Sequence, residues 1–336
     1  MVPKYNGIIV CKFEGAREIF LGGVEMENSE RNFVKIIKEI CEEENIQIES
    51  FSYDWIFKLH KNGVYNYILG YQFGLNTCSV HSICCDKSAA SEVMSALNIP
   101  NIEHIFFMSP TNQKYVGKNG NWLAMTELLN TYGKLVCKSN NGTGGNSVYC
   151  VSNQYELENA AFKVQRSSRA MAISPYYDIE NEYRTIVLNG EIKLVYVKQR
   201  PYIIGDGIHS IANLVCKEIE NGKSVKLDEM EQKDFYKILD ENEIFYLGWK
   251  HNLGKGSYAV IEDSDIVIRN IQEIVYNVVE KMNIRFASID IVKCNGEYKV
   301  LEINSGVMME HFSQQDDNTY KIAKNIYREA ILEMMQ

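Results

Sequence analysis

The chain has 336 residues, of which 46% are hydrophobic and 24% charged. These values are ordinary for a globular protein large enough to hold two or three packed subdomains. The formal net charge of −9 argues against a nucleic-acid scaffold, because phosphate backbones are held by clustered lysines and arginines. We therefore expect no nucleic-acid partner.

Targeting segments and disulfides are not expected either. The apolar run at residues 8–11 is too short for a signal peptide, and no stretch approaches the roughly 20 apolar residues of a membrane-spanning helix. Nine cysteines occur singly or as the adjacent pair Cys84 and Cys85, without CxxC spacing. This usage indicates reduced thiols, so we expect a cytoplasmic protein with no membrane partner.

The first 85 residues have the pattern of an α/β segment. Residues 29–45 are predicted to form a helix, because apolar residues recur there at the spacing of one helical face. Strands are predicted at residues 7–13, 46–51 and 65–70. A second helix is expected at residues 87–97, with Asp86 as its N-cap.

The middle and end of the chain alternate strands with amphipathic helices. Two Asn-Gly pairs, at residues 189–190 and 295–296, are the strongest short-range hairpin signals that a sequence carries. The remaining predicted strands are residues 135–138, 147–151, 170–174, 182–188, 191–197, 286–293 and 297–304. The remaining predicted helices are residues 153–164, 267–282 and 318–335.

A glycine-rich segment follows Lys138 and contains Gly142, Gly144 and Gly145. Such a loop lets backbone N–H groups approach phosphate oxygens closely. It is not a Walker loop, because Gly-Lys-Ser/Thr is absent and the next segment is β-patterned. A plain glycine-rich hairpin turn is the alternative interpretation.

The second Asn-Gly hairpin carries a candidate metal site. Ile289 and Ile291 share one face of its first strand, and Leu301 and Ile303 share one face of its second. If these four line a common core, the opposite face displays Ser288, Asp290, Val300, Glu302 and Asn304. Two acids and an amide suit Mg²⁺, which prefers hard oxygen ligands. The alternative is a solvent-facing hairpin side with ordinary acidic residues.

The register of this hairpin can be predicted from its two faces. A plain two-residue turn would place Asp290 opposite Leu301 and would mix the core and site faces. We therefore predict a three-residue loop or a bulge. Either would set Asp290 opposite Glu302 and Ser288 opposite Asn304, because directly opposed residues share a face.

A third group of candidates is cationic. Arg184 lies in the strand that enters the first hairpin, and Lys198 and Arg200 lie where the return strand ends. Closely spaced cations at a strand end suit a developing phosphoryl or acyl-phosphate charge. A solvated basic strand end is the alternative.

Together these segments resemble the ATP-grasp superfamily. The resemblance implies that Lys87 and Lys138 contact ATP, together with the glycine-rich loop, and that the backbone of residues 175–178 reads adenine. The residues that this hinge contributes are Tyr176, Tyr177 and Asp178. The resemblance further implies that Glu182 binds ribose and that Asp290, Glu302 and Asn304 hold the metal ion.

Within that superfamily the chain is most similar to cyanophycin synthetases and to the glutathione-forming domain of bifunctional γ-glutamylcysteine–glutathione synthetases. The similarity rests on residues 182–190, 198–201, 204–214 and 250–256. Two features depart from the pattern. Ser288 stands where the D-alanine ligase branch has an arginine, and Lys198 and Arg200 do not align uniquely with the single basic residue of the related synthetases.

The resemblance implies an α/β (α+β) fold in which two lobes grip ATP. It divides the chain into an N-terminal domain at 1–85, a central lobe at 86–180 and a C-terminal lobe at 181–336. The implied activity is ADP-forming ligation of a small-molecule carboxylate and an amine through an acyl phosphate, with ATP and Mg²⁺ or Mn²⁺. A peptide or protein side chain as substrate and a non-catalytic ATP-sensing module remain alternatives, and a homo-oligomer is an open possibility.

Overall fold

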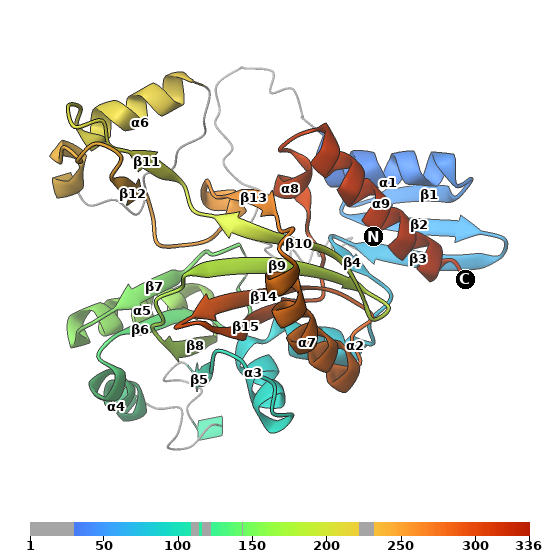
Figure 1. Ribbon diagram of the computed structural model, residues 1–336. Helices are drawn as coiled ribbons and strands as arrows, with labels where there is room; N and C mark the ends of the chain where they lie inside the picture. The colour runs from blue at the N-terminus through green and yellow to red at the C-terminus, as the bar shows by residue number, and fades with distance from the viewer. Residues whose placement is uncertain (1–29, 109–113, 116–121, 143, 222–231) are drawn as a thin grey trace, which may run out of the picture.

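The computed structural model describes residues 30–108, 114–115, 122–142, 144–221 and 232–336. Its strands form antiparallel sheets, which helices cover on several faces (Figure 1). None of the helices in these ranges combines the length and apolarity needed to cross a bilayer.

The largest sheet has the strand order β13-β10-β9-β14-β15. Its strands are β9 (Asn181–Leu188), β10 (Glu191–Gln199), β13 (Tyr258–Ile261), β14 (Phe286–Cys294) and β15 (Glu297–Asn304). Both predicted Asn-Gly turns are confirmed. Each has positive φ at both residues, 49° and 85° in one and 51° and 78° in the other, as a type I′ turn requires.

One face of this sheet packs against α7 (Asp265–Met282), whose buried stripe includes Ile271, Val275 and Val278. The same apolar cluster contains residues of α2 (Cys78–Cys85) and α3 (Lys87–Ala96). Segments on both sides of residue 86 therefore share one core with the large sheet. The domain boundaries stay a prediction.

A second, four-stranded sheet has the order β5-β8-β6-β7 and is called the central sheet below. Its strands are β5 (Ile105–Met108), β6 (Leu135–Ser139), β7 (Val148–Val151) and β8 (Ala170–Pro175). One face packs against α4 (Trp122–Tyr132) and α5 (Gln154–Ser167) in a separate apolar cluster. The opposite face carries Lys138 and Ser174, because side chains alternate along a strand.

The N-terminal part pairs with the C-terminal end of the chain. Helix α1 (Asn32–Glu43) lies beside α9 (Asp317–Met334), and both share a core with an antiparallel sheet of order β1-β2-β3-β4 (Figure 1). Its strands are β1 (Gln47–Phe51), β2 (Ile56–Lys61), β3 (Val64–Leu69) and β4 (Gln72–Phe73). Phe33, Phe73 and Tyr327 are among the rings that join the two ends.

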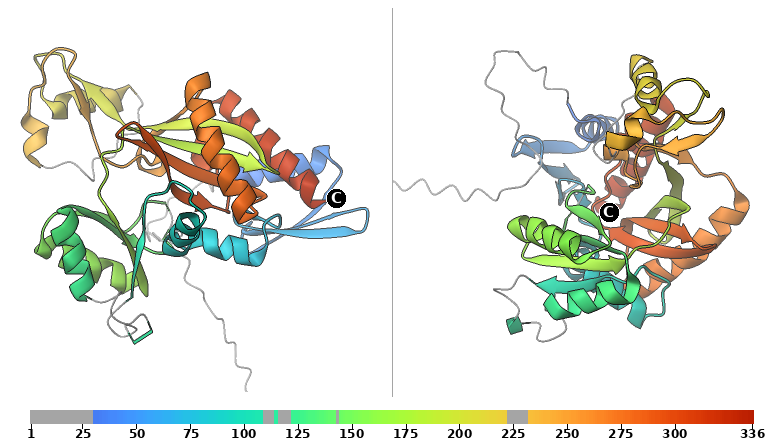
Figure 2. Two further views of the ribbon diagram at one scale, coloured as in Figure 1. Left: turned by 60° about the horizontal axis from the view of Figure 1, so that its bottom comes forward. Right: turned by 90° about the vertical axis from the view of Figure 1, so that its left-hand side faces the viewer.

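A small unit is inserted between β10 and β13. It consists of β11 (Tyr202–Ile204), α6 (Ile211–Glu220), the 3-10 helix η2 (Gln232–Tyr236) and β12 (Ile244–Tyr246) around its own apolar cluster. Two shorter helical elements, η3 (Leu253–Lys255) and α8 (Glu310–Ser313), follow β12 and β15 in the chain. Figures 1 and 2 show the small unit and the central sheet at the same end of the large sheet.

The mixed α and β composition is confirmed, and the predicted helices and strands appear with small shifts at their ends. The strand predicted at 7–13 lies outside the described residues. Helix α2, strand β2 and helix α4 were not predicted. The N-terminal segment differs in kind from a parallel α/β unit, because its four strands follow one another in an antiparallel meander.

Candidate active site

One row of side chains crosses four strands of the large sheet. Tyr196 on β10 is opposite Arg184 on β9, Arg184 is opposite Asp290 on β14, and Asp290 is opposite Glu302 on β15. Opposed residues of antiparallel strands point to the same face. Residues 106 positions apart in the chain are thereby brought side by side.

The predicted register of β14 and β15 is confirmed. The turn is a two-residue one, with Cys294 opposite Glu297, and a bulge between Asp290 and Ile291 restores the pairing of Asp290 with Glu302. Ser288 is opposite Asn304, as predicted. The bulge supplies the offset that a longer loop would have supplied.

The same bulge overturns the predicted positions of two residues. Val300 was expected on the site face, but it is opposite Ile291 and is fully buried in the core beside α7. Leu301 was expected in that core. It is the extra residue of the bulge, and it packs with Val292 and Cys294 instead. Alternation along β14 puts these two partners on the face of Asp290.

Asp290 is the centre of a buried ion-pair network. Arg184 binds its carboxylate with two hydrogen bonds, Nε to Oδ1 and Nη2 to Oδ2, both of 2.8 Å. Lys198 Nζ lies 2.8 Å from Oδ2. Burial acts to lower the pKa of Arg184, but the adjacent Asp290 carboxylate outweighs burial and holds that pKa well above its usual value.

Lys198 also pairs with Glu182, at 2.5 Å between Nζ and Oε1. Burial and Arg184 act to lower the pKa of Lys198, whereas Asp290 and Glu182 raise it, and the net pKa is raised. The Lys198 ammonium is therefore protonated at neutral pH. Burial raises the pKa of Glu182 against the attraction of Lys198.

Glu302 and Asn304 continue the polar face along β15. Asn304 Nδ2 donates a hydrogen bond of 3.2 Å to Glu302 Oε1, and Lys87 Nζ lies 3.8 Å from Glu302 Oε2. Burial acts to raise the pKa of Glu302, but Lys87, Lys138 and Lys198 together lower it below its usual range. The carboxylate is therefore ionised.

Lys138, on the central sheet, faces these acids from the other side. Its side chain is buried, and no carboxylate of the described residues lies within 4 Å of its ammonium. Burial is the main cause that lowers its pKa to about 8, with Glu302 acting in the opposite direction. Within the described part of the chain, Lys138 is thus a buried cation with no carboxylate in direct contact.

The glycine-rich loop after Lys138 is tied to the start of α3. Asn140 accepts hydrogen bonds from Lys87 N at its backbone carbonyl and from Ser88 N at Oδ1 (3.2 and 3.1 Å), and Asp86 caps the helix at Ala89 N. Lys87 Nζ donates to the Gly142 carbonyl at 2.5 Å. The first amides of α3 are therefore occupied by the chain itself.

The tip of that loop reaches across to the segment between β12 and β13. A Cβ at Gly145 would lie 2.5 Å from Asn252 Nδ2, and Gly145 has a φ of +68°. Asn252 is held in place because its Oδ1 accepts from Gly254 N at 2.8 Å. Only glycine fits at this contact.

The predicted hinge residues and Arg200 lie at the margins of the charged cluster. Tyr176 N donates to the Lys134 carbonyl, and the Lys134 ammonium lies 3.6 Å from the centre of the Tyr176 ring. Tyr177 belongs to the apolar cluster that includes Leu301. Asp178 lies in the segment that connects β8 to β9.

Arg200 does not join the carboxylates within the described part of the chain. It stacks on Tyr246 at 4.1 Å.

Several polar residues beside the cluster were not predicted as site residues. Asn140, His104 and His251 are buried, and each has a side-chain nitrogen with no hydrogen-bond partner in the described structure. His251 Nδ1 bonds to the Lys198 carbonyl at 2.9 Å, and burial is the main cause that lowers its pKa to about 4. Asn140 lies in the predicted glycine-rich segment, and His251 lies in residues 250–256, which are similar to the related synthetases.

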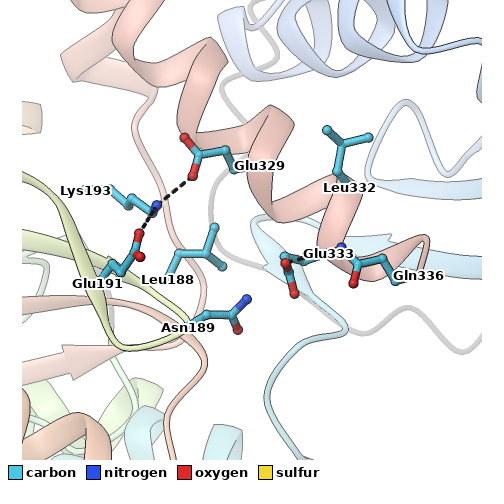
Figure 3. Close-up of a pocket in the computed structure, with 8 residues that line it drawn as sticks. All are labelled: Leu188, Asn189, Glu191, Lys193, Glu329, Leu332, Glu333 and Gln336. Atoms are coloured by element: carbon cyan, nitrogen blue, oxygen red, sulfur yellow. Dashed lines mark hydrogen bonds and ion pairs between the residues drawn. The ribbon is translucent and has the colours of Figure 1, made fainter.

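A surface depression of about 420 Å³ lies elsewhere, between the β9–β10 hairpin and α9 (Figure 3). Lys193 bridges Glu191 and Glu329 there, at 2.6 and 2.7 Å. None of the predicted site residues lines it. Among the described residues, no group of three or more His, Cys, Asp and Glu side chains could hold a metal ion, so the candidate metal set is two carboxylates and one amide.

Comparison with known proteins gives no matching family model. Cyanophycin synthetase from Synechocystis is 23% identical over 262 residues, which is 70% of this chain and 28% of that protein. The chain thus spans just over a quarter of the length of this relative.

Two solved structures superpose over most of the chain. The bifunctional glutathione synthetase from Pasteurella multocida has a TM-score of 0.53 and 16% identity, over 88% of this chain and 44% of that one. D-alanyl-alanine synthetase A from Vibrio cholerae has a TM-score of 0.52 and 12% identity, over 90% and 92%. The chain has the ATP-grasp fold. In this fold, the charged cluster lies between the central sheet and the large sheet.

Proposed function

We propose that this protein is an ATP-dependent carboxylate–amine ligase that forms ADP through an acyl phosphate. The observation that carries the proposal is the buried Lys138, which interacts electrostatically with Glu302 and Asp290 of the large sheet and has no carboxylate within 4 Å among the described residues. A buried ammonium is unfavourable unless an anion accompanies it. A phosphate group of a nucleotide would supply the negative charge that the Lys138 ammonium requires.

The charge of the whole cluster supports an anionic ligand. Four cations surround three carboxylates, which leaves an excess of one positive charge (4 − 3 = 1). The cations are Lys87, Lys138, Arg184 and Lys198, and the carboxylates are Glu182, Asp290 and Glu302. An ATP polyphosphate reverses the sign of this excess, and a divalent cation offsets part of the negative charge that ATP brings.

The donor types suit Mg²⁺ or Mn²⁺, and both oxygens of Asp290 also bind Arg184 or Lys198 in this structure. Asp290 and Glu302 are direct neighbours across two strands, and Asn304 uses its amide nitrogen on Glu302, which leaves its carbonyl oxygen as a hard ligand. These three residues would hold the ion. When bound, the ion neutralises charge on the terminal phosphates during transfer.

The chain's own residues would carry out the remaining steps. Lys87 and Lys138 hold the phosphates while an oxygen of the substrate carboxylate attacks the γ-phosphorus and the bond to ADP breaks. The substrate amine then attacks the acyl carbon, phosphate leaves, and the amine loses a proton. Gly145 lies close to Asn252, and we propose that a loop held there excludes water from the acyl phosphate.

The substrate class is proposed by analogy. The three similar proteins are named for the synthesis of cyanophycin, glutathione and D-alanyl-alanine. We accordingly propose amino acids or short peptides as both carboxylate and amine. The chain covers only part of two of these proteins, so the proposal concerns the activation and ligation steps that this cluster could perform.

The test is an ADP-release screen of the purified protein with amino acids and short peptides, added singly and in pairs. We expect ADP release to require a carboxylate and an amine together. Lys138→Ala should lower the rate by at least about 100-fold, because it removes the charge nearest the transferred group. Lys163→Ala is the matched control, since this lysine lies over the Tyr149 ring on the helix-covered side of the same sheet.

Two results would contradict the proposal. One is an unchanged rate in Lys138→Ala. The other is ATP binding without ADP release under any substrate pair, which would favour an ATP-sensing module.

A further inference from the structure

His104 occupies an unusual place at the join of the two sheets. The segment before it pairs with the edge of β15, with Ile102 N donating to the Val300 carbonyl (2.8 Å) and Val300 N donating to the Pro100 carbonyl (2.9 Å). Strand β5 of the central sheet begins directly after it, at Ile105. His104 is therefore held between the central sheet and the bulge at Leu301.

The side chain points to the face of the central sheet that carries Lys138. Ile105 and Phe107 pack into the cluster beneath α4 and α5, so His104 belongs to the opposite face of the strand. Extending the β5–β8 register by one residue sets His104 opposite Ser174, on the face that carries Lys138. The imidazole thus lies on the same face of the central sheet as Lys138, next to the proposed phosphate site.

The hydrogen bonds of His104 define its free nitrogen. Its backbone N donates to Ser91 Oγ at 3.0 Å, and its ring bonds to the Ile102 backbone. Nε2 is buried and has no partner in the described structure, so the bond to Ile102 belongs to Nδ1. Burial, and then Lys138 and Lys87, hold the pKa of His104 well below its usual value. The ring is neutral, and Nε2 presents a lone pair.

The neighbouring wall is apolar. Ile102 belongs to a cluster formed with Tyr177, Ile179, Val292, Cys294 and Leu301. This cluster joins the predicted hinge to the site face of the large sheet. A nucleotide base held beside Tyr177, Ile179 and Leu301, the partly buried members of this cluster, would lie next to the segment that carries His104.

We propose that His104 selects the nucleotide base by accepting a hydrogen bond from the exocyclic N6 amine of adenine. This inference rests on the proposed ATP-dependent function. A buried acceptor without a partner is unfavourable, and an N–H donor from the ligand relieves it. Guanine presents a carbonyl oxygen at the same position, which would face the lone pair of Nε2, so GTP would be rejected.

The test measures nucleotide binding by calorimetry, without amino acids. The ligands are ATP, GTP and purine riboside 5′-triphosphate, which lacks the N6 amine. We expect wild-type protein to bind ATP at least tenfold more tightly than the other two. His104→Phe keeps a flat ring but no acceptor, and it should reduce ATP affinity at least tenfold while leaving purine riboside triphosphate affinity unchanged.

A second substitution of His104 and a control substitution of another histidine test whether the acceptor of His104 decides the preference for ATP over GTP. In His104→Gln the amide can rotate to offer either oxygen or N–H, so the ratio of ATP to GTP affinity should fall toward one. His60→Phe is the control, because His60 stacks on Tyr65 on the N-terminal sheet and should keep the wild-type ratio.

The outcomes separate this inference from the proposed function. Equal loss of affinity for ATP and purine riboside triphosphate in His104→Phe would overturn base selection while leaving ATP binding intact. So would wild-type ATP-to-GTP ratios in both His104 variants. Absence of ATP binding by the wild-type protein would overturn the ATP-dependent function, and base selection with it.

Discussion

Replacing Asp290 with Asn tests whether the charge network at the centre of the site exists. In the structure, Arg184 and Lys198 both bind the Asp290 carboxylate, and Lys198 also binds Glu182. These four groups are two cations and two anions, so the set is neutral. Asp290→Asn keeps the shape of the side chain but leaves one buried positive charge without a partner.

The expected cost follows from that imbalance. Breaking a buried ion pair by removing one partner destabilises a protein by about 3–5 kcal/mol. At roughly 2 °C per kcal/mol for a chain of this size, the midpoint of thermal unfolding should fall by roughly 6–10 °C. The double variant Asp290→Asn/Arg184→Met leaves the pair of Lys198 and Glu182 balanced, so its midpoint should recover to within roughly 3 °C of wild type.

The assay is thermal unfolding followed by circular dichroism, in the absence of nucleotide and divalent ions. Asp263→Asn is the control, since Asp263 is exposed in the loop before α7 and its replacement should change stability by less than about 0.5 kcal/mol. A single variant as stable as wild type would refute the buried network. A double variant less stable than the single would refute the charge argument.

Three further predictions concern the ligand. The pKa of Lys138, about 8, implies that its charge is lost as pH rises, so calorimetric ATP affinity should fall by up to about tenfold per pH unit above pH 8; a pH-independent affinity would contradict this. Glu302→Gln removes a carboxylate that raises the pKa of Lys138, so the loss of ATP affinity should begin at a lower pH than in the wild-type protein. A loss that begins at the wild-type pH would argue against an interaction between Glu302 and Lys138. Gly145→Ala should raise the KM for ATP at least tenfold, because the added Cβ would lie too close to Asn252. Gly144→Ala is the control, since Gly144 has the same φ of +68° and its only neighbour within 4 Å among the described residues is Asn146 Nδ2 at 3.8 Å, and its KM should stay near the wild-type value. Equal effects of the two substitutions would show that backbone strain alone is responsible.

Local patterns predicted most of the elements that build the site. Asn-Gly pairs fixed both hairpins, because the type I′ turn needs positive φ at two residues. The pairing of Asp290 with Glu302 followed from strand alternation combined with a buried face. Helix α3 followed from Asp86, whose carboxylate caps the first turn.

The position of the bulge could not be predicted. The alternation of core-facing and site-facing residues required one extra residue in one of the two strands. A bulge at any of several positions along β14 or β15 would have met this requirement. The sequence contains no glycine at the bulge to mark it. Val300 and Leu301 were therefore assigned to the wrong faces, although the acids were placed correctly.

Long-range pairing was also beyond local patterns. Arg184 meets Asp290 because β9 and β14 are neighbours, and strand order is decided by packing across the whole sheet. Lys198 was predicted as a strand-end cation for a developing phosphoryl or acyl-phosphate charge, and its burial between two carboxylates was not predicted. His104 lies beside β15 because residues 100–102 pair with that strand.

The most direct test of the proposed chemistry follows one oxygen atom. Once the screen has identified a carboxylate substrate, that substrate is labelled with ¹⁸O in its carboxyl group, and the released phosphate is analysed by mass spectrometry. Attack on the γ-phosphorus and later displacement by the amine would transfer one ¹⁸O atom to each phosphate, with ADP as the other product. Unlabelled phosphate, or AMP and pyrophosphate as products, would contradict an acyl-phosphate ligase.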